Sequence, residues 1–299
     1  MRGRSSCCER CRSKQAALRR GKRQRHGRRR MTRTNINEHA GSDRAAPRNV
    51  ESAGYREYAP CGALRPYVEC FWSAVPGSAV SARVRRVLPD GCVDIIAECD
   101  GTATDISVVG TMTRALVVES SPRAHFIGVR FRPGVAGAIL GVPACEVTDA
   151  SVPLAELWRE TESMTDGIVM APSVARRLRE LERMLVRRLR EVPVLTPAVQ
   201  AAARTIFHAN GNLSVAALGP TLGVTRQHLA RTFARDVGIS PKMLARVARM
   251  RAAVDRVRHG AAPAWSRLAL DLGYYDQSHL VHDLKELTGL TPGEWAAVR

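Results

Sequence analysis

Two stretches near the carboxyl terminus carry long polar side chains directly after a glycine-containing turn, and such side chains can hydrogen-bond to nucleic acid. Glutamine and arginine form paired hydrogen bonds with base edges, whereas lysine and histidine mostly contact phosphates. The candidates are Arg226, Gln227, His228 and Arg231 in the first stretch, and Asp276, Gln277, Ser278, His279, His282 and Lys285 in the second. Arg231 is the best single candidate in the first stretch. The alternative for each residue is a solvated helix face without a ligand.

An internal repeat with an offset near 50 residues positions these side chains. The recurring positions are Leu218, Leu222 and Gly223 with Leu268, Leu272 and Gly273, Leu229 and Phe233 with Leu280 and Leu284, and Gly238-Ile239-Ser240-Pro241 with Gly289-Leu290-Thr291-Pro292. Each copy predicts a short helix, a tight turn and a second helix of about three turns. This is the helix-turn-helix plan, which places one helix in a major groove.

A long helix is predicted between the two copies. Ser240 can cap its start, Pro241 suits its first turn, and Gly260 can end it after about Arg258. Its apolar stripe consists of Met243, Leu244, Val247, Met250, Val254 and Val257. At 1.5 Å per residue the helix would be roughly 26 Å long. With packing on both sides, it could hold two recognition helices about one turn of B-DNA apart.

The net charge of +18 is unevenly distributed along the 299 residues. Residues 1–49 hold 16 Lys/Arg against 3 Asp/Glu, residues 50–195 hold 17 against 18, and residues 196–299 hold 13 against 7. The middle is neutral, as in a ligand-binding or protein-contact domain, while the last hundred residues keep a basic excess suited to phosphate contacts. Aromatic residues make up only 5 % of the chain, which argues against single-strand stacking surfaces. No apolar stretch reaches the roughly 18 residues of a membrane helix.

The first 49 residues are predicted to be a disordered basic tail, because they contain few apolar residues. They lack the apolar core of a secretory signal. Met31 is an alternative start, so the tail is either a start-site artefact or a functional basic arm. Cys7 and Cys8 with Cys11 include a C-x2-C spacing, but a structural zinc site needs four ligands. The five other cysteines (Cys61, Cys70, Cys92, Cys99 and Cys145) suit reduced, buried thiols in the cytosol.

Residues 200–299 resemble the DNA-binding domain of AraC-type transcriptional regulators. In the first copy the resemblance rests on Leu213-Ser214, Leu218, Gly223-Val224-Thr225, Leu229, Arg231-Thr232-Phe233 and Gly238-Ile239-Ser240-Pro241. In the second copy it rests on Leu268, Gly273-Tyr274, Gln277-Ser278, Leu280 and Thr288-Gly289-Leu290-Thr291-Pro292. Residues 55–160, with Leu88-Pro89-Asp90-Gly91 and the run from Gly128 to Gly134, are similar to an uncharacterised β-rich domain that precedes AraC-type domains in some regulators.

The resemblance implies a cytoplasmic DNA binder that regulates transcription without a metal or other cofactor. Double-stranded DNA is its implied partner. The amino-terminal domain would sense a small-molecule effector or form a homodimer, and RNA polymerase would be a further partner if the chain is an activator. The resemblance covers about four fifths of the chain, because the first fifth is unmatched.

The expected fold class is α+β, with a β-rich, cupin-like or barrel-like domain at 50–160, a helical linker at 161–197 and an all-α domain with two helix-turn-helix motifs at 198–299. Strands are predicted at 83–88, 92–98, 105–110, 114–119 and 125–132, separated by Asp-Gly turns. A helix over 171–192, with an apolar stripe from Val174 to Leu189, should cover the β-rich domain or a second subunit.

The β-rich region offers one candidate site. Arg130 and Arg132 share one face of a strand, with His125 on the other. The two arginines either clamp an anion or face solvent. Asp90 and Asp94 are either ligand contacts or turn residues without a function. No nucleophile, base and orienting group can be assembled from this sequence, so an enzyme is not predicted.

Three alternatives depend on particular residues. Pro220 lies inside the first helix of the first copy, where a missing N–H and a clash with the Ala216 carbonyl predict a kink. His279 and His282 could suggest a metal, but two imidazoles without further ligands are weak evidence. Rival functions are an alkyl-DNA repair protein with an amino-terminal cysteine cluster and a non-specific architectural binder that depends on the basic tail.

Overall fold

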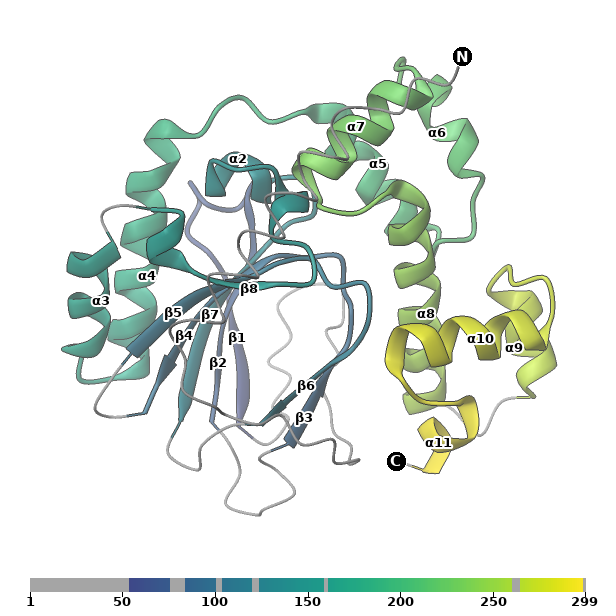
Figure 1. Cartoon of the computed structure of the whole chain (residues 1–299), viewed down its shortest axis with the longest axis horizontal. Helices are drawn as coiled ribbons and strands as arrows, with labels where there is room; N and C mark the ends of the chain where they lie inside the picture. The colour runs from purple at the N-terminus through teal and green to yellow at the C-terminus, as the bar shows by residue number, and fades with distance from the viewer. Residues whose placement is uncertain are drawn as a thin grey trace, which may run out of the picture. The chain divides into compact units, whose positions relative to one another are not determined.

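The chain folds into a β-rich domain followed by an all-α domain, as Figure 1 shows for a computed structural model. The structure describes residues 54–75, 84–100, 104–119, 124–158, 161–259 and 264–297. The predicted α+β class is therefore confirmed. The predicted basic tail, with Met31 and its three cysteines, lies outside the described residues.

Six antiparallel strands form the main sheet, and two more form a small separate sheet. The main sheet runs β1 (Tyr55–Tyr58), β2 (Val68–Ala74), β7 (His125–Phe131), β4 (Asp94–Cys99), β5 (Thr104–Val109) and β8 (Ser151–Pro153). The small sheet pairs β3 (Val84–Val87) with β6 (Leu116–Glu119). The five predicted strands are confirmed as β3 to β7, whereas β1, β2 and β8 were not predicted.

One face of the main sheet packs against helices to form the core of the β-rich domain. On β7 the alternating residues Ile127, Val129 and Phe131 are fully buried on that face. They share the core with α3 (Thr161–Val169), α4 (Val174–Arg188) and α2 (Ala136–Leu140). The described residues of this part also form the 3-10 turns η2 (Ala144–Glu146), η3 (Leu154–Glu156) and η4 (Leu189–Glu191). The helix predicted over 171–192 is confirmed as α4 with η4, and it covers the sheet.

The all-α domain contains two helix-turn-helix units around one long helix. In chain order its helices are α5 (Pro197–His208), α6 (Val215–Thr221), α7 (Arg226–Asp236), α8 (Pro241–His259), α9 (Trp265–Asp271), α10 (Gln277–Thr288) and α11 (Pro292–Ala297). Leu244 and Ala248 of α8 belong to the core of the first unit, whereas Met250 and Val254 belong to the core of the second. The predicted long helix is thus confirmed, and it serves both cores.

The described residues of the β-rich domain and of the all-α domain belong to one compact unit. Side chains of the β-rich domain accordingly bond to the helices of the all-α domain at several points, described below. Helices α3 and α4 lie within the predicted linker, and their apolar sides belong to the core of the β-rich domain. The domain boundaries near residues 160 and 197 stay predictions.

Candidate nucleic-acid interface

The first helix-turn-helix unit presents α7 through a turn that requires glycine. Gly223 has a φ of 68°, a conformation that side chains with a Cβ resist. The Thr225 hydroxyl then caps α7 by accepting a hydrogen bond of 3.1 Å from the His228 N–H. Leu229 and Phe233 are buried and fix the inner face of the helix. The opposite face is therefore exposed.

The second unit repeats this construction with one change at the cap. Gly273 has a φ of 74°, and the Asp276 carboxylate caps α10 by accepting a 2.8 Å hydrogen bond from the His279 N–H. Leu280 and Leu284 are buried at the positions of Leu229 and Phe233. The two recognition helices are thus equivalent elements on a common core helix.

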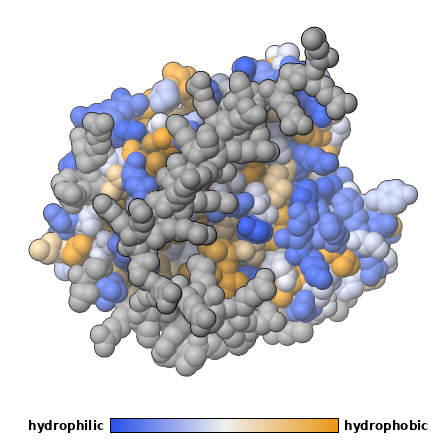
Figure 2. Space-filling view, viewed as in Figure 1, coloured by the Kyte–Doolittle hydropathy of each residue, from blue (hydrophilic) through white to orange (hydrophobic). Residues whose placement is uncertain are grey.

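Every predicted contact residue lies at an exposed position. The structure places them on α7 and α10, or at the cap of α10, as Arg226, Gln227, His228, Arg231, Asp276, Gln277, Ser278, His279, His282 and Lys285. Figure 2 shows mainly hydrophilic surface in the part of the view where Figure 1 places α9 and α10. Exposed polar residues on two equivalent helices are what major-groove recognition requires.

Two family models match the chain. Residues 219–297 match a helix-turn-helix domain, and residues 56–153 match a domain of unknown function. The carboxy-terminal domain is an AraC-type helix-turn-helix domain. The chain accordingly carries an AraC-type helix-turn-helix domain, with the uncharacterised domain ahead of it.

Several solved structures are similar to parts of this chain. The carboxy-terminal domain of the response regulator AraT from Geobacillus stearothermophilus is 24% identical, with a TM-score of 0.33 over 35% of this chain and 87% of that one. ToxT from Vibrio cholerae O395 is 10% identical, with a TM-score of 0.39 over 76% of this chain and 97% of that one. The xylose-binding transcription activator XylR is 19% identical, with a TM-score of 0.32 over 42% of this chain and 40% of that one.

No curated protein matches this sequence. Among the described residues, no helix combines the length and the apolar character that a membrane span requires.

Some exposed residues of the AraC-type domain already have partners within the protein. The Asp276 carboxylate is engaged as the cap of α10. The His279 ring meets the Tyr274 ring edge to face, with centroids 5.2 Å apart, and its Nδ1 accepts a hydrogen bond from the Tyr275 N–H. His282 Nε2 lies 3.6 Å from a Glu286 carboxylate oxygen. Asp276 and His279 therefore orient the second recognition helix.

One exposed aromatic residue of the AraC-type domain was not among the predicted contacts. Tyr275 is 87% exposed in the turn directly before α10. Tyr275 lies between Gly273 and the cap residue Asp276, at the amino end of a recognition helix. This position in the sequence could have identified it as a further contact candidate.

A buried ion pair holds α10 against α8. Arg246 Nη2 contacts the Asp283 carboxylate at 2.7 Å and the Glu286 carboxylate at 2.6 Å. The Asp283 side chain is only 3% exposed, whereas that of Glu286 is 49% exposed. The hydrogen bond from Arg246 lowers the pKa of the Glu286 carboxyl. Arg249 supports the same unit, because its guanidinium lies 5.1 Å from the centre of the Tyr274 ring.

Pro220 lies in the last turn of α6 and does not shorten that helix. Helix α6 and its counterpart α9 both contain seven residues. Pro220 is exposed, and so is Ala216, whose carbonyl would otherwise accept a bond from residue 220. The predicted kink stays a prediction.

Replacing Pro220 with alanine is expected to stabilise the first helix-turn-helix unit by about 1–3 kcal/mol, because the helix regains an N–H donor and loses a steric clash. Urea unfolding measures the change. The reciprocal control is Leu270→Pro at the equivalent position of α9, where the side chain is 62% exposed. That substitution should destabilise the second unit. If Pro220→Ala changes neither stability nor DNA affinity, the proline carries no strain.

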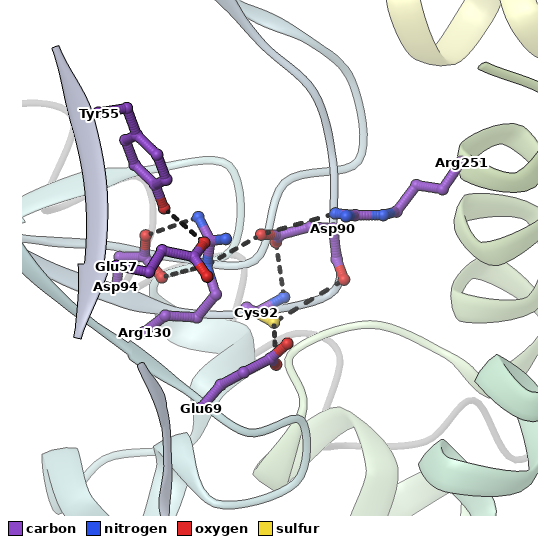
Figure 3. A network of polar contacts seen from close by, with 8 residues as sticks. All are labelled: Tyr55, Glu57, Glu69, Asp90, Cys92, Asp94, Arg130 and Arg251. Atoms are coloured by element: carbon purple, nitrogen blue, oxygen red, sulfur yellow. Dashed lines mark hydrogen bonds and ion pairs between the residues drawn. The ribbon is translucent and has the colours of Figure 1, made fainter. Parts of the chain in front are cut away.

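The β-rich domain contains a network of charged residues that ends on α8 (Figure 3). Arg130 contacts the Asp94 carboxylate at 3.2 Å and the Asp90 carboxylate at 3.2 Å. Asp90 lies between Arg130 and Arg251 of α8, whose Nη1 is 3.9 Å from the same carboxylate oxygen. Burial raises the pKa of the Asp94 carboxyl to about 6, and the charge of Arg130 opposes that shift.

This network corrects the prediction for Arg130. Neither the anion clamp nor the solvent-facing pair describes it, because its side chain is only 16% exposed and bonds to two carboxylates of the protein. Arg132 is exposed and donates a hydrogen bond to the Arg65 carbonyl. His125 is exposed at the start of β7. The register of β4 and β7, which sets Asp94 opposite Arg130, decides the outcome.

The cysteines of the described residues form no disulfide. Cys70, Cys92 and Cys99 are buried as predicted, whereas Cys61 is exposed and Cys145 is half-buried. The prediction of a buried thiol is therefore wrong for Cys61. Within the described ranges, no three His, Cys, Asp or Glu side chains are grouped so that they could hold a metal ion.

Proposed function

We propose that this regulator binds duplex DNA sequence-specifically and reads two successive major-groove segments with α7 and α10. One observation carries the proposal: two equivalent recognition helices, each with an exposed polar face, share the single core helix α8. A helix of 19 residues is about 28 Å long at 1.5 Å per residue, which approaches the repeat of B-DNA.

The exposed side chains divide by chemistry. Arg231 on α7 and Gln277 on α10 can each form paired hydrogen bonds with a base edge. Arg226, His282 and Lys285 carry donors suited to phosphates, which fix the register of the protein on the duplex. The cap residues Thr225 and Asp276 orient the helices. The base contacts supply the specificity, and the phosphate contacts supply affinity that depends on salt.

Control from the β-rich domain is the second part of the proposal. A cleft of about 340 Å³ lies between α2, the segment that follows α4, and the end of α7, and its lining includes Arg188, Thr196 and Arg235. A small-molecule effector there would touch the β-rich domain and a recognition helix together. Homodimer formation by the β-rich domain, contact with RNA polymerase and a cytoplasmic location follow from the regulator role as further proposals. The chain acts as a regulator rather than as an enzyme.

Fluorescence anisotropy tests the DNA-binding function. A DNA duplex is first selected from a random-sequence pool by its binding to the full chain, and we call it the enriched duplex. The full chain is then titrated against this duplex and against a scrambled duplex over a salt series. We expect a preference of about 10³-fold or more for the enriched duplex at moderate salt. Arg231→Ala should cost about 1–3 kcal/mol in binding to the enriched duplex. His282→Ala should weaken binding to both duplexes alike and reduce the salt dependence. Equal binding of both duplexes with a steep salt dependence, or no binding, would contradict the proposal.

The matched control is Arg204→Ala. Arg204 is exposed on α5, outside both recognition helices, so its loss removes the same charge without removing a proposed contact. Its preference for the enriched duplex should equal that of the wild type. The same titration, repeated with a variant that lacks residues 1–30, tests the rival architectural function. A non-specific architectural binder that depends on the basic tail would lose all DNA affinity on this deletion. A repair protein would instead hold stoichiometric zinc at its amino-terminal cysteines.

A further inference from the structure

We propose that the β-rich domain braces the two recognition helices against each other, so that Arg86 and Thr111 set the separation of the two DNA segments that the chain accepts. This role rests on the DNA-binding function proposed above. It extends that function to positioning residues that lie outside both helix-turn-helix motifs. We call Arg86 together with residues 110–115 the brace.

The first contact of the brace is at the carboxyl end of α7. Thr111 is fully buried, and its Oγ1 donates a hydrogen bond of 2.5 Å to the Val237 carbonyl oxygen. Next to it, the Thr148 hydroxyl donates to the Gly238 carbonyl at 2.7 Å. The last carbonyls of a helix have no partner within the helix. The β-rich domain supplies the donors that α7 lacks.

The second contact is at the carboxyl end of α10, on the equivalent atom. Val237 and Thr288 each precede the glycine that follows their recognition helix. Arg86 Nη1 donates a hydrogen bond of 2.8 Å to the Thr288 carbonyl, and the Ala115 N–H donates one of 2.7 Å to the Leu287 carbonyl. The charge of Arg86 is also favourable at the negative end of a helix dipole. Both copies of the repeat are thus held at the same place.

A short anchored segment joins the two contacts. Thr111 contacts the first copy, and Ala115 contacts the second copy four residues later. Between them, the Thr113 N–H and hydroxyl donate to the two carboxylate oxygens of Asp149, at 2.7 and 2.6 Å. The Asp149 N–H in turn donates to the Thr111 carbonyl. This anchoring fixes the separation of the two contact points.

The brace gives the recognition helices a second connection beside α8. A single helix between two bodies leaves them free to rotate and bend about it, whereas a second connection removes much of that freedom. Both contacts lie at the carboxyl ends of α7 and α10, so the amino-terminal turns with Arg226 and Gln277 stay exposed. Two segments on one face of B-DNA lie at a fixed repeat. A braced pair should therefore tolerate only one spacing.

The test inserts one or two base pairs between the two segments of the enriched duplex and measures affinity by anisotropy. For the wild type we expect each insertion to weaken binding about tenfold or more, because both segments can no longer be contacted together. For the Arg86→Met/Thr111→Val variant we expect the penalty to fall to about threefold or less, because the helices can then adjust. Affinity for the unmodified duplex should fall only slightly.

The matched control is the Arg85→Met/Thr205→Val variant. Arg85 neighbours Arg86 on β3 and donates to the Val75 carbonyl, and the Thr205 hydroxyl donates to the Ala201 carbonyl within α5. The control therefore removes the same two chemical groups away from the recognition helices. Its insertion penalty should equal that of the wild type.

A brace variant that keeps the full insertion penalty overturns the proposal. A brace variant that binds the unmodified duplex more tightly and keeps the wild-type preference for its spacing also overturns it, since the contacts would then inhibit DNA binding. Wild-type protein that binds enriched and scrambled duplexes alike contradicts the DNA-binding function instead, so the two failures are distinguishable. If the double variant does not fold, Thr111→Val and Arg86→Met decide singly, and each should lower the penalty.

Discussion

Replacing Arg130 with methionine is expected to lower the free energy of unfolding of the β-rich domain by about 3–5 kcal/mol, because removing one partner of a buried ion pair leaves an uncompensated charge. Here two carboxylates, those of Asp94 and Asp90, depend on the same guanidinium. Asp90 keeps a contact with Arg251, so the Asp94 carboxylate bears most of the loss. Urea unfolding at neutral pH measures the change.

The loss in the Arg130→Met variant should depend on pH. Burial already raises the pKa of the Asp94 carboxyl to about 6, and removal of the nearby positive charge raises it further. A carboxyl group whose pKa rises on folding favours the folded state at low pH, and this advantage is lost as the pH rises through the pKa. The variant should therefore lose less stability at pH 5 than at pH 8.

Arg132→Met is the matched control for this prediction. Arg132 directly follows β7, two residues beyond Arg130. It is exposed, and its guanidinium donates a hydrogen bond to the Arg65 carbonyl. Its replacement should cost under about 1 kcal/mol. Equal losses for the two arginines would show that Arg130 is not the charge that stabilises the buried carboxylates.

Replacing Arg246 with methionine is expected to destabilise the second helix-turn-helix unit by about 3–5 kcal/mol, because the Asp283 carboxylate then stays buried without its cation. The side chain of Asp283 is 3% exposed, and that of Glu286 can turn to solvent because it is 49% exposed. DNA affinity should fall with stability, since α10 is held to α8 by this pair. Urea unfolding and anisotropy on the same samples measure both effects.

Two further variants make this prediction specific. Arg256→Met removes another arginine of α8, whose contact with Asp271 is 3.8 Å long and exposed, and should cost under about 1 kcal/mol. Arg246→Met combined with Asp283→Leu replaces the pair with apolar groups and should recover much of the lost stability. A double variant as unstable as Arg246→Met alone would contradict the unpaired-charge explanation.

The all-α domain could be predicted in detail because its signals are local. Gly223 and Gly273 mark turns that need a positive φ, and the repeated leucine positions mark the inner faces of the helices. Both facts are visible within a few residues of the chain. Each of these patterns occurs in both copies of the repeat. Aligning the two copies therefore identified the ten exposed contact candidates on the two recognition helices.

The β-rich domain was predicted less completely because its pairing is not local. Strand β2 is buried at six of its seven positions, so it lacks the alternation that identifies a half-exposed strand. Strand β8 has three residues and ends in proline. The period of two placed Arg130 and Arg132 on one face, but it could not show that β4 sets a carboxylate beside only one of them.

The contacts of the brace were beyond reach of the sequence for the same reason. Thr111 and Val237 are 126 residues apart, and Arg86 and Thr288 are 202 residues apart. No local pattern marks a threonine or an arginine as the partner of a distant helix end. The sequence does show the recurring glycines Gly238 and Gly289, which identify the carbonyls before them as equivalent but do not identify the donors.

Hydroxyl-radical footprinting of the full chain on an enriched duplex tests the central claim most directly. Two recognition helices on one core helix predict two protected stretches on the same face of the DNA, with centres about 10 base pairs apart. Arg231→Ala should weaken the protection of one stretch, and His282→Ala that of the other. A single protected stretch, or protection that is the same on scrambled DNA, would contradict the reading of two segments by one chain.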